Sequence, residues 1–281
     1  MSKVHGLVVG INDFEGTQND LSGCVNDALD INRLLSTEHL SGSPIDQLPF
    51  FHNADSVTIL LDQQAKLAQA LSAVNTLLSK LGDDDLGFLW FSQHGTYVKD
   101  KNGDEPDGND EALVFQDFGL WIDDNIYKTL SKRNPKSRLF LGTDACHSGT
   151  VHRMYSPVGR LVNRRVRYMP ADHFPIGKRP EVAPLRQRGV FVKRQDPLPN
   201  VIHMAGCQDI EYCFDASFRQ RPNGAFTYYL LKALSTLKPG AVYGDWFKAV
   251  GGFLPSVEYP QQPRCNAKPE CLAWPIPLRK G

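Results

Sequence analysis

Two short motifs carry the residues whose chemistry is most informative in this sequence. His94 lies in FSQHGT and Cys146 in TDACHSG, and each motif follows an apolar run of the kind that forms a buried strand. If these runs are neighbouring parallel strands, His94 and Cys146 lie side by side at the carboxyl edge of a sheet, where open α/β sheets place their reactive groups. A thiol beside an imidazole is the minimal arrangement for nucleophilic attack on an acyl group. The pair predicts a cysteine peptidase.

Each member of this pair also has a competing interpretation. A thiol titrates near 8.5, so Cys146 needs an imidazole or oriented backbone N–H groups to attack at neutral pH. A lone cysteine after a strand is otherwise a small buried hydrophobe, and the second motif argues against that here. His94 is the candidate general base or acid, and Gly95 behind it removes a Cβ where the acyl oxygen must lie. His147 is nearer to Cys146 in sequence, but adjacent residues at a strand end point apart.

Apolar periodicity predicts the elements that must position these residues. Continuous apolar runs, typical of strands covered on both faces, occur at 4–11, 57–61, 86–91, 137–142 and 200–206. Apolar residues recur at helical spacing over 21–35, 64–81, 123–132 and 225–237. The alternation predicts a mostly parallel sheet flanked by helices, an α/β fold in a single domain over residues 1–281.

One segment, residues 159–196, departs from this alternation. It contains ten arginines or lysines against three acidic residues and is punctuated by prolines. We expect a long surface loop between the fourth and fifth strands, which is either a solvated basic loop or a functional one. It separates a larger part, 1–158, that carries the Cys–His pair from a smaller part, 197–281.

Two aspartates are candidates for a cation pocket. A pocket that takes arginine or lysine needs a carboxylate at its base, because a buried cation without a partner is prohibitively unstable. Asp144 lies two residues before Cys146 on the same side of its strand, and Asp27 projects from the first turn of a predicted helix. Structural alternatives stay open, since Asp27 also suits a helix N-terminus and Asp144 a hydrogen-bonded turn.

Taken together, the motifs resemble those of the metacaspases and related prokaryotic caspase-like peptidases. The matching stretches follow one another in the same order between residues 4 and 235: LSGCVNDA (21–28), FSQHGT (91–96), NGDEPDGNDEALV (102–114), WIDDNIY (121–127), TDACHSG (143–149), HMAGCQD (203–209) and NGAFTYYLLKAL (223–234). The resemblance implies the caspase-like (caspase-hemoglobinase) fold, a Cys–His dyad and cleavage after arginine or lysine.

The same resemblance implies roles for further residues. The backbone N–H groups of Gly95 and Cys146 are the expected oxyanion donors. The primary specificity pocket is expected to be formed by Cys24, Asp27, Ser92 and Asp144. Gln93 departs from the family, where glycine is commoner before the histidine, and we expect it to narrow the mouth of the site.

An acidic stretch raises the question of calcium. Its carboxylates are hard oxygen ligands suited to calcium, although the spacing is not that of an EF-hand and an acidic turn is the structural alternative. Many metacaspases are calcium-activated, and the resemblance maps their ligands onto Asp110, Asp123 and Asp124. The set is incomplete, because Arg153 stands where a further aspartate is expected. We therefore expect no required cofactor, with calcium as an optional activator.

Composition bounds the remaining possibilities. The net charge of zero gives no reason to expect nucleic acid or an anionic membrane as partner, and no apolar run approaches the roughly 18 residues of a membrane span. The absence of a signal-peptide pattern and of a disulfide framework predicts the cytoplasm, with buried thiols at Cys207, Cys213, Cys265 and Cys271.

Two functional classes follow. The favoured one is an endopeptidase acting on proteins or peptides with arginine or lysine at the cleavage site, activated by self-cleavage within 159–196 or by a protein partner. The alternative is a non-catalytic caspase-like interaction or regulatory module, which would be expected to have lost Cys146 or His94.

Overall fold

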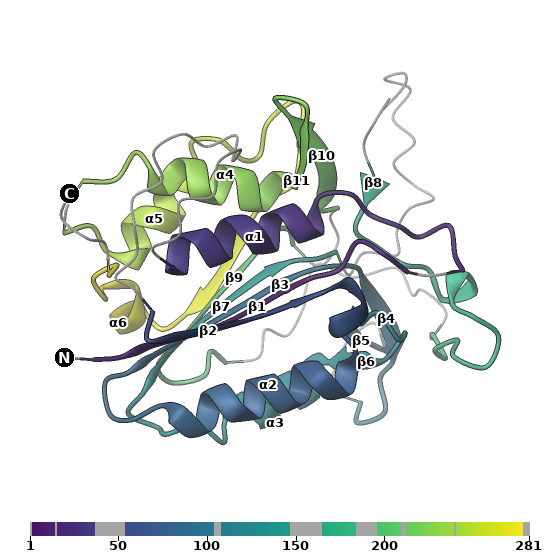
Figure 1. The fold of residues 1–281 in the computed structure, drawn as a ribbon, viewed down its shortest axis with the longest axis horizontal. Coiled ribbons are helices and arrows are strands. Elements are labelled where there is room, and N and C mark those ends of the chain that lie inside the picture. Colours follow the sequence, from purple (N-terminus) through teal and green to yellow (C-terminus); the bar gives the residue numbers. More distant parts are fainter. Residues whose placement is uncertain are drawn as a thin grey trace.

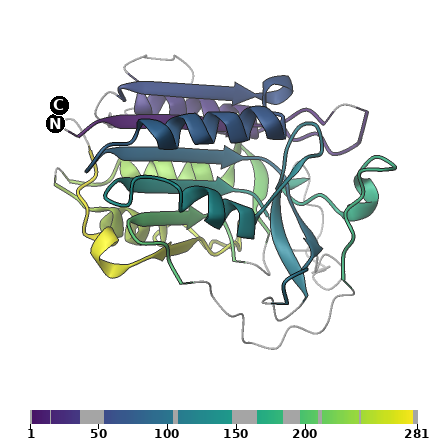
Figure 2. The same cartoon turned by 90° about the horizontal axis from the view of Figure 1, so that it is seen from below.

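A six-stranded sheet forms the centre of the computed structural model, which describes residues 2–14, 16–36, 54–103, 108–146, 165–183, 196–208, 212–238 and 240–277. The strand order is β12-β9-β7-β3-β1-β2 (Figures 1 and 2). These strands are β1 (Val4–Gly10), β2 (Ser56–Leu61), β3 (Leu86–Ser92), β7 (Arg138–Asp144), β9 (Val201–Ala205) and β12 (Arg264–Ala267). Neighbours pair in parallel except β12, which is antiparallel to β9. The predicted mostly parallel α/β sheet is confirmed.

Helices cover both faces of this sheet (Figure 1). One face carries α1 (Cys24–Leu35), α4 (Ala225–Leu234) and α5 (Tyr243–Val250), and the other carries α2 (Leu67–Lys80) and α3 (Asp123–Leu130). A short helix, α6 (Pro269–Leu272), follows β12. In the described ranges no helix combines the length and the apolar character that crossing a membrane requires.

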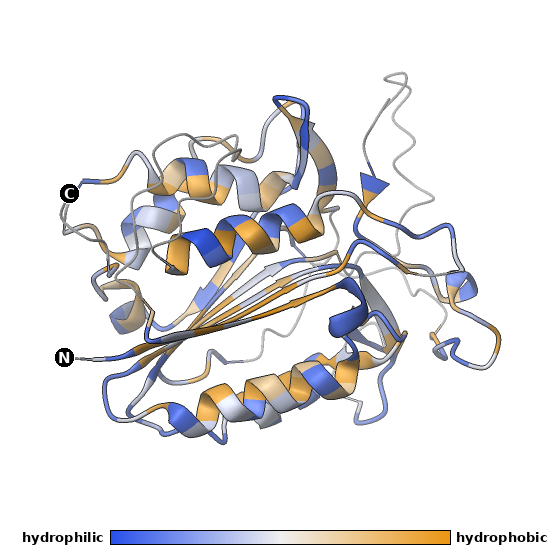
Figure 3. Ribbon diagram, in the orientation of Figure 1, coloured by the Kyte–Doolittle hydropathy of each residue, from blue (hydrophilic) through white to orange (hydrophobic). Residues whose placement is uncertain are grey.

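Both faces of the sheet are apolar because successive side chains of a strand point to opposite sides. In β3, Phe88 and Trp90 belong to the core beneath α1, α4 and α5, whereas Leu89 and Phe91 belong to the core beneath α2. Figure 3 shows the resulting continuous hydrophobic band along the central strands. Burial on both faces explains why these strands are unbroken apolar runs in the sequence.

Two small antiparallel sheets lie beyond the carboxyl ends of the central strands (Figure 1), and the sequence patterns did not predict them. One is formed by β4 (Gly95–Lys99), β5 (Asn109–Val114) and β6 (Leu120–Ile122). The other is formed by β8 (Arg165–Val166), β10 (Phe214–Phe218) and β11 (Arg221–Gly224). They frame the edge of the sheet at which the two motifs end.

Part of the basic segment is buried, which corrects the expectation of a surface loop throughout 159–196. Within the described residues 165–183, Arg167 and Met169 are fully buried and Phe174 is nearly so. The physical reason is backbone pairing, since β8 hydrogen-bonds to β10 and Tyr168 bridges to Gly95. The rest of the predicted loop, 159–164 and 184–195, lies outside the described residues.

Candidate active site

The register of β3 and β7 brings the two motifs together. Ser92 pairs with Asp144 at the ends of these parallel strands. His94 and Cys146 therefore each lie two residues beyond a paired position. Both side chains are buried, at 3% and 0% exposure. Adjacent strand ends thus place the imidazole and the thiol at the same edge of the sheet, as the motifs predict.

The hydrogen bond of His94 defines its tautomer. Nε2 lies 2.6 Å from the carbonyl oxygen of Asn19, which can only accept, so Nε2 carries the proton. The other nitrogen, Nδ1, is buried and makes no hydrogen bond to any part of the chain that the structure describes. Burial lowers the pKa of His94 to about 4, against the smaller opposing influence of the backbone of Asn19 and Arg167. The ring is therefore neutral at pH 7, with a lone pair on Nδ1.

Two backbone N–H groups beside His94 and Cys146 converge on one oxygen. The N–H of Gly95 donates to the carbonyl oxygen of Arg167 at 2.9 Å, and the N–H of Cys146 donates to the same oxygen at 3.1 Å. A pair of preorganised amides aimed at one acyl oxygen has the form of an oxyanion hole. The N–H groups of Gly95 and Cys146 thus bind one acyl oxygen, and their role as oxyanion donors stays a prediction.

The candidate specificity residues form a fully buried polar pocket. Asp27 and Asp144 have no exposed surface, and the Ser92 hydroxyl donates to Asp27 at 2.7 Å. Thr227 holds Asp144 in place, donating from its N–H at 2.9 Å and from Oγ1 at 2.7 Å. Cys24 is buried beside them, and burial raises the pKa of its thiol well above the usual value. Because the Ser92 hydroxyl donates to its carboxylate, the side chain of Asp27 faces into this pocket.

The guanidinium of Arg167 fills this pocket. It lies 2.7 Å from Asp27, 3.2 Å from Asp144 and 3.0 Å from Asp215, and it also donates to Ser92 Oγ at 2.7 Å. Burial raises the pKa of Asp144 to about 6, although the charge of Arg167 acts in the opposite direction. Three carboxylates around one guanidinium are the arrangement that a buried arginine requires.

Sequence reasoning missed Asp215 and the contribution of Asn19. Asp215, on β10, accepts from the N–H groups of Ser22 at 2.8 Å and Gly23 at 2.9 Å in addition to Arg167. Asn19 contributes through its backbone carbonyl oxygen. Every residue has such an oxygen, so the residue type at position 19 does not indicate this role. A single carboxylate in CFDAS carries no motif, so spacing alone could not have indicated it.

Gln93 does not narrow the mouth of the site as expected. Its side chain is fully buried, and Nε2 donates to the carbonyl oxygen of Val114 at 2.9 Å. The N–H of Val114 in turn donates to the carbonyl of His94 at 2.9 Å. Gln93 therefore ties the end of β3, where His94 lies, to β5.

Cys146 belongs to a small buried cluster with Cys207 and Cys213. The Sγ atoms of Cys207 and Cys213 are 2.7 Å apart, and neither residue is in a disulfide. Burial raises the pKa of Cys213 to about 12, so its thiol is protonated at neutral pH. The expectation of buried thiols fits Cys207, Cys213 and Cys271, whereas Cys265 is partly exposed.

The expected calcium ligands lie on two neighbouring elements. Asp110 lies on β5, whereas Asp123 and Asp124 begin α3, and Asp124 accepts from Asn102 Nδ2 at 2.7 Å. The ranges that the structure describes contain no group of three or more His, Cys, Asp or Glu side chains able to hold a metal ion. Calcium activation through Asp110, Asp123 and Asp124 stays a prediction.

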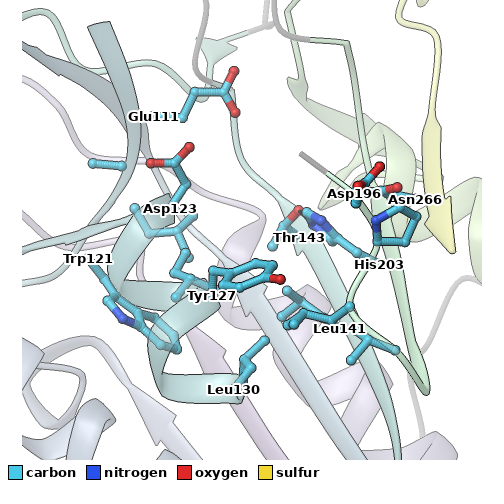
Figure 4. Close-up of a pocket in the computed structure, with 16 residues that line it drawn as sticks. Glu111, Trp121, Asp123, Tyr127, Leu130, Leu141, Thr143, Asp196, His203 and Asn266 are labelled. Atoms are coloured by element: carbon cyan, nitrogen blue, oxygen red, sulfur yellow. Dashed lines mark hydrogen bonds between the residues drawn. The ribbon is translucent and has the colours of Figure 1, made fainter. Parts of the chain in front are cut away.

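A separate pocket lies between α3 and the strands β7 and β9 (Figure 4). Its walls include Glu111, Asp123, Asp196 and His203. His203 Nε2 lies 2.9 Å from Thr143 Oγ1, so His203 is a wall residue of this pocket.

The fold is of the caspase-like class, a mostly parallel α/β sheet flanked by helices. The family model described as metacaspase, peptidase C14 domain, matches residues 5–155. The chain belongs to this family.

Similar proteins have been found among curated sequences and solved structures. The chain is 34% identical over 155 residues to Metacaspase-1 of Saccharomyces cerevisiae (strain ATCC 204508 / S288c), covering 52% of this chain and 33% of that protein. It is 27% identical over 252 residues to Metacaspase-1 of Arabidopsis thaliana, covering 85% and 61%. It spans about a third of the length of the yeast relative. A crystal structure of a Geobacter sulfurreducens protein matches with a TM-score of 0.68 and 26% identity over 96% of both chains.

Proposed function

We propose that this chain is a cysteine endopeptidase that cleaves proteins or peptides after arginine or lysine. One observation carries the proposal: Arg167 occupies the carboxylate pocket while its carbonyl oxygen accepts from Gly95 and Cys146. The side chain of one residue is thus bound by the carboxylate pocket while its carbonyl is bound by the two backbone N–H groups. This is the relation that a peptidase must impose on the residue before its scissile bond.

The geometry supports a division of labour between the dyad residues. Cys146 is the nucleophile, and His94 Nδ1 takes the thiol proton, because Nε2 is already committed to Asn19. The neutral state of His94 at pH 7 suits it to act as a base. After the attack the protonated ring donates to the leaving amine.

The same geometry supports selectivity for a cation. Asp27, Asp144 and Asp215 surround the guanidinium. The pocket is buried, so water is not available there to solvate an uncharged or acidic side chain of a substrate. An aspartate in this pocket would face three carboxylates without a counter-ion, which is strongly unfavourable. Substrates with aspartate at this position should therefore not be cleaved.

A reporter peptide with arginine before the leaving group tests the proposal. The wild-type chain should hydrolyse it, and Cys146→Ala should not, while both unfold at the same temperature because sulfur to hydrogen is a small packing change at a strand end. Equal turnover by the purified Cys146→Ala chain would rule out the mechanism. Absence of turnover by both would favour the non-catalytic interaction module.

Activation is proposed to come from self-cleavage within 159–196 or from a protein partner. Calcium is a further proposed activator, through Asp110, Asp123 and Asp124. Reporter turnover measured in excess chelator and then in excess calcium tests it, and full activity in chelator would exclude a calcium requirement.

A further inference from the structure

The chain on either side of Arg167 crosses the candidate active site in an extended conformation. Before Arg167, β8 pairs antiparallel with β10, and the N–H of Arg167 donates to the Cys213 carbonyl at 3.0 Å. After it, the N–H of Met169 donates to the Gly95 carbonyl at 2.9 Å, and Thr96 Oγ1 donates to the Met169 carbonyl at 2.7 Å. Peptides recognised by strand addition are held in the same manner, backbone to backbone.

The contacts of Arg167 are more than a fold-stabilising ion pair requires. Carboxylates alone would satisfy a buried guanidinium, yet the Arg167 carbonyl also accepts both oxyanion-hole N–H groups. The fit is close, since a Cβ on Gly224 would lie 2.6 Å from Arg167 Nη1. The pocket thus leaves no free space beside this arginine side chain. The peptide bond at the carbonyl held by Gly95 and Cys146 is Arg167–Tyr168.

We propose that Arg167–Tyr168 is the first bond that this enzyme cuts, and that until then the chain around Arg167 is a built-in inhibitor of the specificity pocket. The inference rests on the proposed function, because it assigns a particular substrate bond to the same dyad and pocket. A tethered segment already seated in the site has a very high effective concentration, so this bond competes favourably with any substrate in solution.

The reaction at this bond is a hydrolysis in two steps. The Cys146 sulfur bonds to the Arg167 carbonyl carbon as His94 takes the thiol proton, and the negative charge develops on the oxygen held by Gly95 and Cys146. The bond to the Tyr168 nitrogen breaks, and the new amine leaves with the proton from His94. Water then attacks the thioester, giving a carboxylate on Arg167 and restoring the thiol.

Release of the new carboxyl end from β10 would open the pocket to other substrates. Activity on a reporter peptide should therefore appear with a lag that matches the loss of intact chain.

Intact mass measured over time on freshly purified protein tests the inference. The wild-type chain should give two fragments, 1–167 and 168–281, in equal amounts, and Cys146→Ala should stay whole. Arg167→Lys should still be cut, with the first fragment now ending in lysine. Arg167→Gln should not be cut at this bond. The matched control is Arg179→Gln, an exposed arginine of the same segment, and it should be cut at 167 as in the wild type.

The outcomes separate this inference from the proposed function. A wild-type chain that hydrolyses the arginine reporter while staying whole, or while cut only elsewhere, overturns the inference and leaves the proposed function standing. Failure of both wild-type and Arg167→Gln chains to hydrolyse the reporter overturns both. If Arg167→Gln does not fold, because three buried carboxylates lose their partner, the fragment masses from the wild-type chain decide alone.

Discussion

The imidazole of His94 is held through Nε2, which leaves Nδ1 as the proton acceptor. Replacing it with alanine should lower kcat on an arginine reporter by about 10²–10⁴-fold, the usual effect of losing a positioned acid–base group. KM should change much less, because the carboxylates that bind the guanidinium remain. Steady-state kinetics on His94→Ala measures both constants. A kcat equal to that of the wild type would contradict the assigned role.

The charge of Asp144 should set the pH dependence of substrate binding. Its burial raises the pKa to about 6. Above that pH the carboxylate is charged and attracts the guanidinium, which is positive throughout, whereas below it the carboxyl is neutral and the attraction is lost. The kcat/KM for arginine peptides should therefore fall as the pH drops through about 6.

A pH–rate profile of Asp144→Asn provides the control. This variant should be slower than the wild type above pH 6, should approach the wild-type rate below it, and should therefore lack the acidic limb near pH 6. An unchanged limb in Asp144→Asn would assign the titration to another group.

Residues were predictable from the sequence when a motif marked them. His94 and Cys146 each end an apolar run, and their two strands prove to be neighbours in register. Asp215 has no such mark, and its role arises only because β10 brings it opposite α1. Arg167 was one of ten basic residues in its segment, and nothing in its spacing distinguishes it from the others.

At the level of elements, the junction of β11 and α4 shapes the pocket. Gly224 ends β11, its N–H donates to Asp27 at 2.9 Å, and an added Cβ would crowd the guanidinium. Gly224→Ala should raise KM for arginine substrates and slow self-cleavage, because the pocket loses volume. Gly244→Ala in α5 is the control, since its Cβ meets nothing closer than 3.3 Å. Equal kinetics for the two variants would contradict this account of the pocket.

Elements with both faces buried were the ones that periodicity predicted well. The apolar runs at 4–11, 86–91 and 137–142 correspond to β1, β3 and β7 within three residues at each end. The short antiparallel strands were missed because polar residues and turns interrupt them, and because β8 is only two residues long and depends on β10 for its pairing. Tertiary pairing of this kind leaves no local pattern.

At the scale of the whole molecule, one sheet joins chain segments from both sides of the proposed cut. In it β7 pairs with β9, and Phe140 stacks on Trp246 with ring centroids 5.6 Å apart. Fragments 1–167 and 168–281 should therefore co-elute in size-exclusion chromatography at the volume of the intact chain and separate only in denaturant. Separation under native conditions would contradict the shared core. The division into parts 1–158, 159–196 and 197–281 stays a prediction.

The central claim is that one cysteine attacks the carbonyl of a residue whose basic side chain lies in the carboxylate pocket. The most direct measurement is covalent labelling of the incubated wild-type chain with a peptidyl-arginine chloromethyl ketone, followed by peptide mass mapping. We predict one adduct, on Cys146, with much slower labelling in Asp144→Ala and none by the matching aspartyl reagent. Labelling of another cysteine, or equal labelling by the arginyl and aspartyl reagents, would contradict the account.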